Sequence, residues 1–175
     1  MKNCNLKLGI RATGDVDVQA PMNEVCKNTA EQIFADDDLA ERLIELRDEN
    51  GGLLSVIFYF KYGSDGSQGH PIFKQILDAE RYQGAVYCTG MVVMQIVAKM
   101  KDGSKHIIYY NALVNSSLSW RPLRLLFKKE STELIREEKA RLDVERAELQ
   151  DFEIMDGVTI TFIGIYSMND MKESV

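Results

Sequence analysis

Two segments of strand length, 53–62 and 85–100, constrain the fold of this 175-residue chain most strongly. Both are rich in Val, Ile, Phe and Tyr, residue types that favour strands over helices. The second segment leads into 101–105, which contains Asp-Gly, and a further β-rich segment follows at 106–115. Asp-Gly between two such segments is a strong β-hairpin signal. The sequence therefore predicts a hairpin over 85–115 and a strand at 53–62 that is covered on both faces.

Three other segments carry helical patterns. In 21–34, which begins near a proline, apolar residues recur every three or four positions. The carboxylates of 36–38 are expected to cap a second helix, which ends at the glycines of 50–52. Segment 131–150 predicts a third helix with a narrow apolar stripe. That stripe comprises Leu134, Ile135, Leu142 and Leu149.

The order of the expected elements points to one fold class. The alternating segment 6–18 predicts a long first strand, and 158–166 predicts a last strand near the centre of the sheet. A short helix is expected to begin at Pro71, and the tail from residue 167 is expected to be mobile. Hairpins mixed with helices predict a single α+β domain over 1–175, with a mainly antiparallel sheet packed with helices.

Composition and charge exclude several classes of protein. The net charge of −6 argues against a protein whose whole surface binds nucleic acid. Cys4, Cys26 and Cys88 are odd in number and widely spaced, so reduced thiols in an intracellular compartment are expected. No apolar run approaches the roughly 20 residues of a membrane span, and the N-terminus lacks the apolar core of a secretion signal. We therefore expect neither a secreted nor a transmembrane protein.

Residue types that carry catalysis are sparse. His70 and His106 are far apart, and no cysteine or carboxylate stands at metal-ligand spacing from either. A general base needs a nucleophile and an orienting group, and nothing in the sequence nominates them. The polar loop expected at 63–69 lacks the Gly-Lys-Ser/Thr ending of a phosphate-binding loop. The sequence thus predicts no enzyme, no catalytic residue, no metal site and no cofactor.

The segment 120–129 interleaves cations with apolar side chains and holds no acid. Its four cations are spaced to share a helical face, which predicts a patch that binds an anionic surface; the alternative is a solvated amphipathic turn. Four cations at about 1 kcal/mol each supply about 4 kcal/mol, a dissociation constant on the order of 1 mM. Such a patch holds a membrane only if many copies act together. The predicted patch comprises Trp120, Arg121, Arg124, Lys128 and Lys129.

The next segment, 130–153, has the opposite charge. It contains nine acidic residues against four basic ones, a balance that suits either a solvated helix or contact with a basic partner. This leaves open a second class of function, a small acidic cytoplasmic inhibitor or immunity protein that occupies a basic groove. Residues 110–113 match the short YxxL motif with which some budding proteins recruit host factors. Their place in an expected strand predicts a core position instead.

Several stretches, taken with the order of elements, resemble the globular domain of rhabdovirus matrix proteins, particularly those of plant-infecting members. Stretch 7–12 and the helix from Asn23 resemble the opening strand and helix of that domain. Stretches 82–87 and 91–96 resemble its central glycine-bearing strand, which a hairpin follows in both. The chain departs from the family in its acidic charge and in lacking a lysine-rich N-terminal arm.

The resemblance implies a non-enzymatic structural protein that self-associates, condenses the nucleocapsid through the viral nucleoprotein and links it to the envelope. It implies a location in the virion and the host cytoplasm, peripheral on the inner membrane face, without direct sequence-specific contact to nucleic acid. In such a lattice, a flexible loop that docks on a neighbouring copy makes a contact that propagates. The expected self-association residues are Ser64, Asp65, Ser67, Gln68, Ile72 and Phe73.

Overall fold

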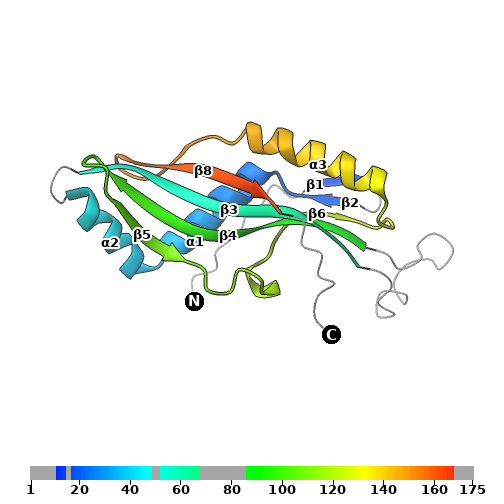
Figure 1. Ribbon diagram of the computed structural model, residues 1–175, viewed down its shortest axis with the longest axis horizontal. Coiled ribbons are helices and arrows are strands. Elements are labelled where there is room, and N and C mark those ends of the chain that lie inside the picture. The colour runs from blue at the N-terminus through cyan, green and yellow to red at the C-terminus, as the bar shows by residue number, and fades with distance from the viewer. Residues whose placement is uncertain (1–10, 15–16, 49–51, 68–85, 168–175) are drawn as a thin grey trace.

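The structure is a computed structural model, which describes residues 11–14, 17–48, 52–67 and 86–167. In these residues three helices pack on a curled, mostly antiparallel sheet that forms a half-barrel (Figure 1), so the predicted α+β fold class is confirmed. The strands are β1 Arg11–Gly14, β2 Asp17–Gln19, β3 Leu53–Ser67, β4 Val86–Met100, β5 Lys105–Tyr110, β6 Arg121–Leu126, β7 Phe152–Met155 and β8 Val158–Tyr166. The helices are α1 Met22–Phe34, α2 Asp37–Asp48 and α3 Thr132–Ala147, with a short 3-10 helix, η2 Ser117–Ser119.

Seven of the described strands follow one another across the sheet in the order β1-β2-β6-β4-β3-β8-β7. The long central pair is β3 and β4, which are antiparallel and remain paired from Leu53 and Met100 to Ser67 and Val86. β8 lies parallel to β3, whereas the other pairings among the described strands are antiparallel. The eighth strand, β5, lies off this path and pairs with β4.

The second edge of β4 is shared between two partners. Its C-terminal part pairs with β5, from Gln95 to Lys99, and its N-terminal part pairs with β6, from Tyr87 to Met91. The connection between β5 and β6, residues 111–120, therefore starts and ends beside the middle of β4. This connection forms one wall of the candidate site.

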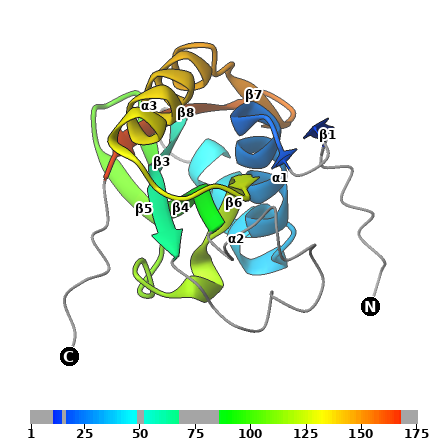
Figure 2. The ribbon, with the colours of Figure 1, turned by 90° about the vertical axis from the view of Figure 1, so that its right-hand side faces the viewer.

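The three helices cover one face of the sheet. Along β3, Val56, Phe58, Phe60 and Tyr62 are buried on this face, because alternate residues of a strand point to the same side. Figure 2 shows α1 and α2 gathered on one side of β3 and β4, and β5, which pairs with β4, contributes Ile108 to the same core. The largest helical share of the core comes from α1, through Met22, Val25, Cys26, Ala30 and Phe34.

The helices begin close to the predicted positions because their capping residues act as the sequence suggests. Asp36 precedes α2, and its Oδ1 accepts hydrogen bonds from the backbone amides of Asp38 at 3.2 Å and Leu39 at 3.3 Å. Ser131 precedes α3, and its hydroxyl accepts from the amide of Leu134 at 3.2 Å. Both contacts satisfy amides that the first turn of a helix leaves without an intrahelical partner.

The predicted hairpin between β4 and β5 is also confirmed. The amide of Met100 donates to the carbonyl of Ser104 at 2.9 Å, and Gly103 adopts a φ of 89°, a region that favours glycine. The Asp102 carboxylate accepts from the hydroxyl and the amide of Ser104, at 2.7 and 2.8 Å. These two bonds hold the pKa of Asp102 below its ordinary value.

Three strand predictions are wrong in their extent. Segment 6–18 does not form one long strand, because β1 and β2 pair with each other antiparallel. β3 continues to Ser67 through a segment expected to be a loop, since each of its last residues pairs with β4. β5 ends at Tyr110, so the motif at 110–113 is not in the core: Tyr110 is 68% and Leu113 is 61% exposed.

β8, the last strand along the chain, is confirmed, and one of its faces is exposed. Val158, Ile160 and Phe162 are buried, whereas Ile163 and Ile165 point to the other face and are exposed. The strand predicted at 53–62 to be covered on both faces is part of β3, whose Ile57, Tyr59 and Lys61 are only half-buried. β7, which pairs with β8, was not predicted. The helix expected at Pro71, the tail after 167 and the matrix-like stretch 82–85 lie outside the described residues.

Candidate functional site on the helix-free face of the sheet

The face of the sheet opposite the helices carries the candidate site, which begins on β3 and β8. Alternation places Ile57, Tyr59 and Lys61 of β3 on this face. The parallel register pairs Tyr59 with Ile163 and Lys61 with Ile165 of β8. Two apolar residues of β8 therefore lie directly beside an aromatic and a cationic residue of β3.

β4 and β5 extend the same surface. Gln95 of β4 pairs with Tyr59 on one side and with Tyr110 of β5 on the other. Further along, Lys99 pairs with Lys105, so two cations lie together at one end. We call the resulting surface the outer patch. It comprises Ser55, Ile57, Tyr59, Lys61, Gln95, Val97, Lys99, Lys105, Ile107, Tyr110, Thr159, Thr161, Ile163 and Ile165.

The outer patch is apolar and basic. Ile107, Tyr110, Ile163 and Ile165 are 52%, 68%, 39% and 53% exposed. The patch contains three lysines, and a carboxylate lies at its edge, because exposed Glu153 of β7 pairs with Thr159 and accepts from the amide of Gly157 at 3.0 Å. Contiguous exposed apolar surface marks interaction sites in proteins that are otherwise well packed. The excess of lysine over acid on this surface favours an occupant with negative charge.

A cavity adjoins the outer patch where the connection 111–120 crosses the sheet. Asn111 anchors the start of this connection: its side-chain amide donates to the carbonyl of Val93 at 2.8 Å and its oxygen accepts from the amide of Leu113 at 2.9 Å. At the other end Trp120 lies against Gly90 of β4. A Cβ on Gly90 would lie 2.4 Å from the Trp120 ring, so only glycine allows this contact.

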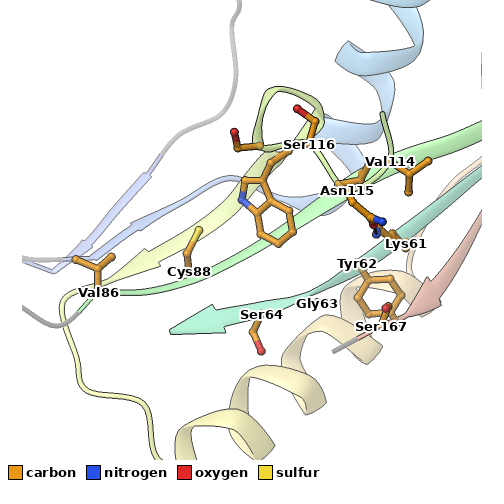
Figure 3. A pocket seen from close by; sticks show the side chains of 13 residues that line it. Lys61, Tyr62, Gly63, Ser64, Val86, Cys88, Val114, Asn115, Ser116 and Ser167 are labelled. Atoms are coloured by element: carbon orange, nitrogen blue, oxygen red, sulfur yellow. Dashed lines mark hydrogen bonds between the residues drawn. The ribbon is translucent and has the colours of Figure 1, made fainter. Parts of the chain in front are cut away.

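The cavity between this connection and the sheet has a volume of about 260 Å³. Figure 3 shows Val86 and Cys88 at one end of it, and Lys61, Val114 and Asn115 at the other. Its walls combine apolar side chains with several hydroxyl groups. The lining residues are Lys61, Tyr62, Gly63, Ser64, Val86, Cys88, Val92, Val114, Asn115, Ser116, Ser117, Trp120 and Ser167.

Among the described residues that line the cavity, Lys61 is the one with a charge. Its Nζ donates to the side-chain oxygen of Asn115 at 2.8 Å, and no carboxylate of the described residues forms an ion pair with it. Lys61 also belongs to the outer patch. The cavity and the patch therefore share a cation whose charge is not neutralised by the described part of the protein.

The structure does not bring the predicted basic patch to one surface. Residues 121–126 form strand β6, so the prediction of a shared helical face is wrong. Trp120 packs on the helix-free face, whereas Arg124 points to the helices and pairs with Glu138 at 2.5 Å and with Asp17 at 3.4 Å. Of the other predicted cations, Arg121 is half-buried, whereas Lys128 and Lys129, which follow β6 in the chain, are exposed.

Glu138 and Arg141 of α3 form an ion pair that is largely buried. Glu138 is 3% exposed and accepts from the Nε of Arg141 at 3.0 Å, while Arg141 also donates to Thr89 at 3.1 Å and to Glu145. Glu145 in turn accepts from the backbone amide of Met22 at 2.9 Å, which places a carboxylate at the N-terminus of α1. The carboxylates of Glu138 and Glu145 therefore serve packing between α3 and the rest of the fold.

The predicted self-association residues do not form a loop where the structure describes them. Ser64, Asp65 and Ser67 belong to β3 and pair with Thr89, Cys88 and Val86 of β4. Ser64 also lines the cavity. The other predicted residues, Gln68, Ile72 and Phe73, lie outside the described residues.

The thiols and the histidines take different positions. Cys26 is buried, and this burial raises the pKa of its thiol far above the ordinary value. Cys88 lines the cavity and is half-buried. His106 is exposed at the start of β5, and His70 lies outside the described residues. Within the described residues, no group of three His, Cys, Asp or Glu side chains is arranged to hold a metal ion.

The outer patch was missed at the sequence level, although part of its signal is present there. The alternate positions of 55–61 read Ser, Ile, Tyr and Lys, and those of 159–165 read Thr, Thr, Ile and Ile, a mixture of polar and apolar residues that suits a half-exposed strand face. What the sequence does not give is the register that places these strands side by side.

Comparison with known proteins does not add to this picture: no protein-family model matches the chain, and no curated protein is significantly similar to it. In the described part of the chain, no helix is both long enough and apolar enough to cross a bilayer.

Proposed function

We propose that this is a non-enzymatic, matrix-like structural protein that attaches to an anionic membrane surface through the outer patch and self-associates there. The observation that carries the proposal is the composition of the patch, in which exposed isoleucine and tyrosine side chains stand among three lysines, with one carboxylate, that of Glu153, at the edge. Peripheral attachment to a bilayer combines apolar burial with electrostatic attraction to anionic lipid.

The magnitudes favour the outer patch over the segment 120–129 as the attachment surface. Three lysines contribute about 1 kcal/mol each near an anionic surface. Completing the burial of four half-exposed apolar side chains adds about 1 kcal/mol each, because full burial is worth about 1.5–3 kcal/mol. The sum of about 7 kcal/mol corresponds to a dissociation constant on the order of 10 µM. A few associated copies suffice to make such attachment firm.

The helical layer has the opposite charge and supports a contact with a basic partner such as a nucleoprotein. Exposed acids lie on α2 and the turn before it, and also in the segment 130–153 that the sequence predicted to be acidic. The first group is Asp36, Asp37, Asp38, Glu41, Glu45 and Asp48, and the second is Glu130, Glu133, Glu137, Glu148, Asp151 and Glu153. The same surface supports the second candidate function, an acidic inhibitor that occupies a basic groove of its target.

Vesicle flotation tests the proposed attachment. Replacing Lys61, Lys99 and Lys105 with Gln should abolish flotation with anionic vesicles, and wild-type flotation should weaken as salt screens the charges. The matched control replaces three exposed cations elsewhere, Lys128, Lys129 and Arg136, with Gln. It loses the same charge and should float like wild type. If the control variant fails to float and the patch variant floats, attachment occurs through the segment after β6 and the proposal is wrong.

Sedimentation at decreasing salt separates the two candidate functions. A matrix-like protein should form assemblies that grow as salt falls, and anionic vesicles should promote them. An inhibitor should stay a defined monomer or dimer under the same conditions. A constant sedimentation coefficient at all salt concentrations, with or without vesicles, would therefore favour the inhibitor.

A further inference from the structure

We propose that the cavity beneath the connection 111–120 binds the chain of a single-chain anionic amphiphile, with Lys61 pairing with its head group. The inference extends the proposed function, on which it rests for the expected class of ligand, because the cavity adjoins the outer patch. It assigns one defined binding site, in addition to the diffuse attraction of the patch to a bilayer.

Two paired glycines, the ring of Trp120 and the bonds of Asn111 together form the cavity. Gly63 and Gly90 pair across β3 and β4, so the sheet has no side chain on either strand at this point. The ring of Trp120 covers Gly90, and the anchoring bonds of Asn111 hold the connection against the sheet. The space that remains is lined by Val86, Val92 and other apolar side chains and is partly open to solvent.

The size of the cavity defines the length of the chain. An engineered apolar cavity of about 150 Å³ accepts benzene, and a water-sized group occupies about 30 Å³. The volume of the present cavity, about 260 Å³, is larger than that of the benzene-binding cavity. At about 30 Å³ per group, it accommodates a chain of about eight carbon atoms.

The charges define the head group. Of the lining residues that the structure describes, Lys61 alone is charged, and its present partner is the neutral amide of Asn115 at 2.8 Å. An incoming carboxylate or phosphate offers Lys61 a charge-assisted hydrogen bond, which is roughly twice as strong as a neutral one. A cationic head group would instead meet Lys61 with like charge. The geometry therefore selects anionic over cationic amphiphiles.

Trp120 provides a direct readout, because it is the single tryptophan of the chain. Octanoate and octyl phosphate should each produce a saturable change in its emission. Octyltrimethylammonium, which has the same chain and the opposite charge, should bind at least about tenfold more weakly. Acetate and inorganic phosphate, which lack the chain, should have no effect. Tighter binding of octyl phosphate than of octanoate would identify a lipid phosphate as the head group, and the reverse order a fatty-acid carboxylate.

Two variants test the assigned contacts. Lys61→Met keeps the apolar stem and should lower octanoate affinity about tenfold, as expected for loss of one charge-assisted hydrogen bond. Lys99→Met removes a cation from the outer patch but not from the cavity, and should bind octanoate like wild type. Cys88→Phe places a ring in the cavity and should abolish the saturable response.

A second measurement does not require the Cys88→Phe variant to fold. In a Cys4→Ser background, where Cys26 is buried, octanoate should slow the alkylation of Cys88, followed by mass spectrometry. Equal binding of octanoate and octyltrimethylammonium would overturn the inference. So would octanoate that neither changes Trp120 emission nor protects Cys88. If the wild-type protein does not bind octanoate but still floats with anionic vesicles, this site is wrong and the proposed function stands. If it binds octanoate but does not float, the proposed function is wrong and this site stands.

Discussion

At the scale of single residues, Glu138 shows how a charged side chain can hold the fold together. It lies on α3 but is 3% exposed, and its oxygens accept from Arg124 of β6 at 2.5 Å and from Arg141 at 3.0 Å. A buried carboxylate is costly unless it is paired and hydrogen-bonded. The two arginines meet that requirement, and they fix the position of α3 over β6.

Replacing Glu138 with Ala should lower the free energy of unfolding by about 3–5 kcal/mol, because the change leaves two arginines without their buried partner. Glu137→Ala is the matched control, since Glu137 is the exposed neighbour on the same helix and its loss should cost no more than about 0.5 kcal/mol. Urea titrations of both variants measure the difference. Equal stabilities would show that the network around Glu138 contributes little.

Tyr62 links the same helix to the sheet and makes stability depend on pH. Burial, and secondly the hydrogen bond that its hydroxyl donates to Asp143 at 3.0 Å, raise the pKa of Tyr62 to about 12. An unfolded tyrosine ionises near pH 10. The raised pKa means that folding favours the neutral hydroxyl, so the contribution of Tyr62 is complete below about pH 10 and is lost between about pH 10 and 12.

The test compares urea midpoints of the wild type and Tyr62→Phe between pH 8 and pH 11. The wild type should lose stability more steeply above about pH 10, because Phe has no group to ionise. Lysines and other tyrosines also titrate in this range, but they are common to both proteins and cancel in the difference. Parallel pH profiles would show that Tyr62 ionises equally easily in the folded and unfolded states.

At the scale of elements, the sequence was informative where the signal is local. The helix α1 and the β4–β5 hairpin follow from apolar spacing, capping and the Asp-Gly turn, all within a few residues. The end of β3 shows the limit of this reasoning. Residues 63–67 contain two glycines and no apolar side chain, which favours a loop. They form a strand because β4 offers each of them a partner, a tertiary effect that overrides propensity.

The candidate site depends on pairings that are even less local. Tyr59 and Ile163 are neighbours in the outer patch but lie far apart in the chain. The alternation that puts each on an exposed face is visible in the sequence, whereas the parallel pairing of β3 and β8 is not. The prediction that the cations of 120–129 share a helical face was wrong for a related reason. Its cations fit a helical period, but β6 forms because β2 and β4 provide partners on both sides.

At the scale of the whole molecule, the two sides of the sheet present opposite chemistry to the surroundings. The outer patch carries lysines and exposed apolar residues, and the far side of the helical layer carries the acids of α2. α2 packs against the inner faces of β3, β4 and β5, and Figure 2 shows α1 and α2 together on that side of the sheet. Because surface charges more than about 8 Å apart are largely screened at physiological salt, each side acts independently. The net charge of −6 therefore does not prevent attachment to an anionic membrane.

This arrangement predicts the orientation of the bound protein, with the outer patch against the membrane and α2 facing away. Two single-cysteine probes measure it, in a background where Cys4 and Cys88 are replaced by Ser and the buried Cys26 is retained. Thr159→Cys lies on the outer patch and Glu45→Cys on α2, and both positions are exposed. Anionic vesicles should slow the reaction of Thr159→Cys with a membrane-impermeant maleimide severalfold and leave Glu45→Cys unaffected.

Salt provides the control for this orientation experiment. At 1 M salt the screening length falls to about 3 Å, so the lysines no longer attract the surface and the protection of Thr159→Cys should disappear. Protection that persists at 1 M salt would indicate attachment by apolar contacts alone. Protection of Glu45→Cys with Thr159→Cys left reactive would place α2 against the membrane. That result contradicts the proposed orientation, because six exposed acids would then face an anionic surface.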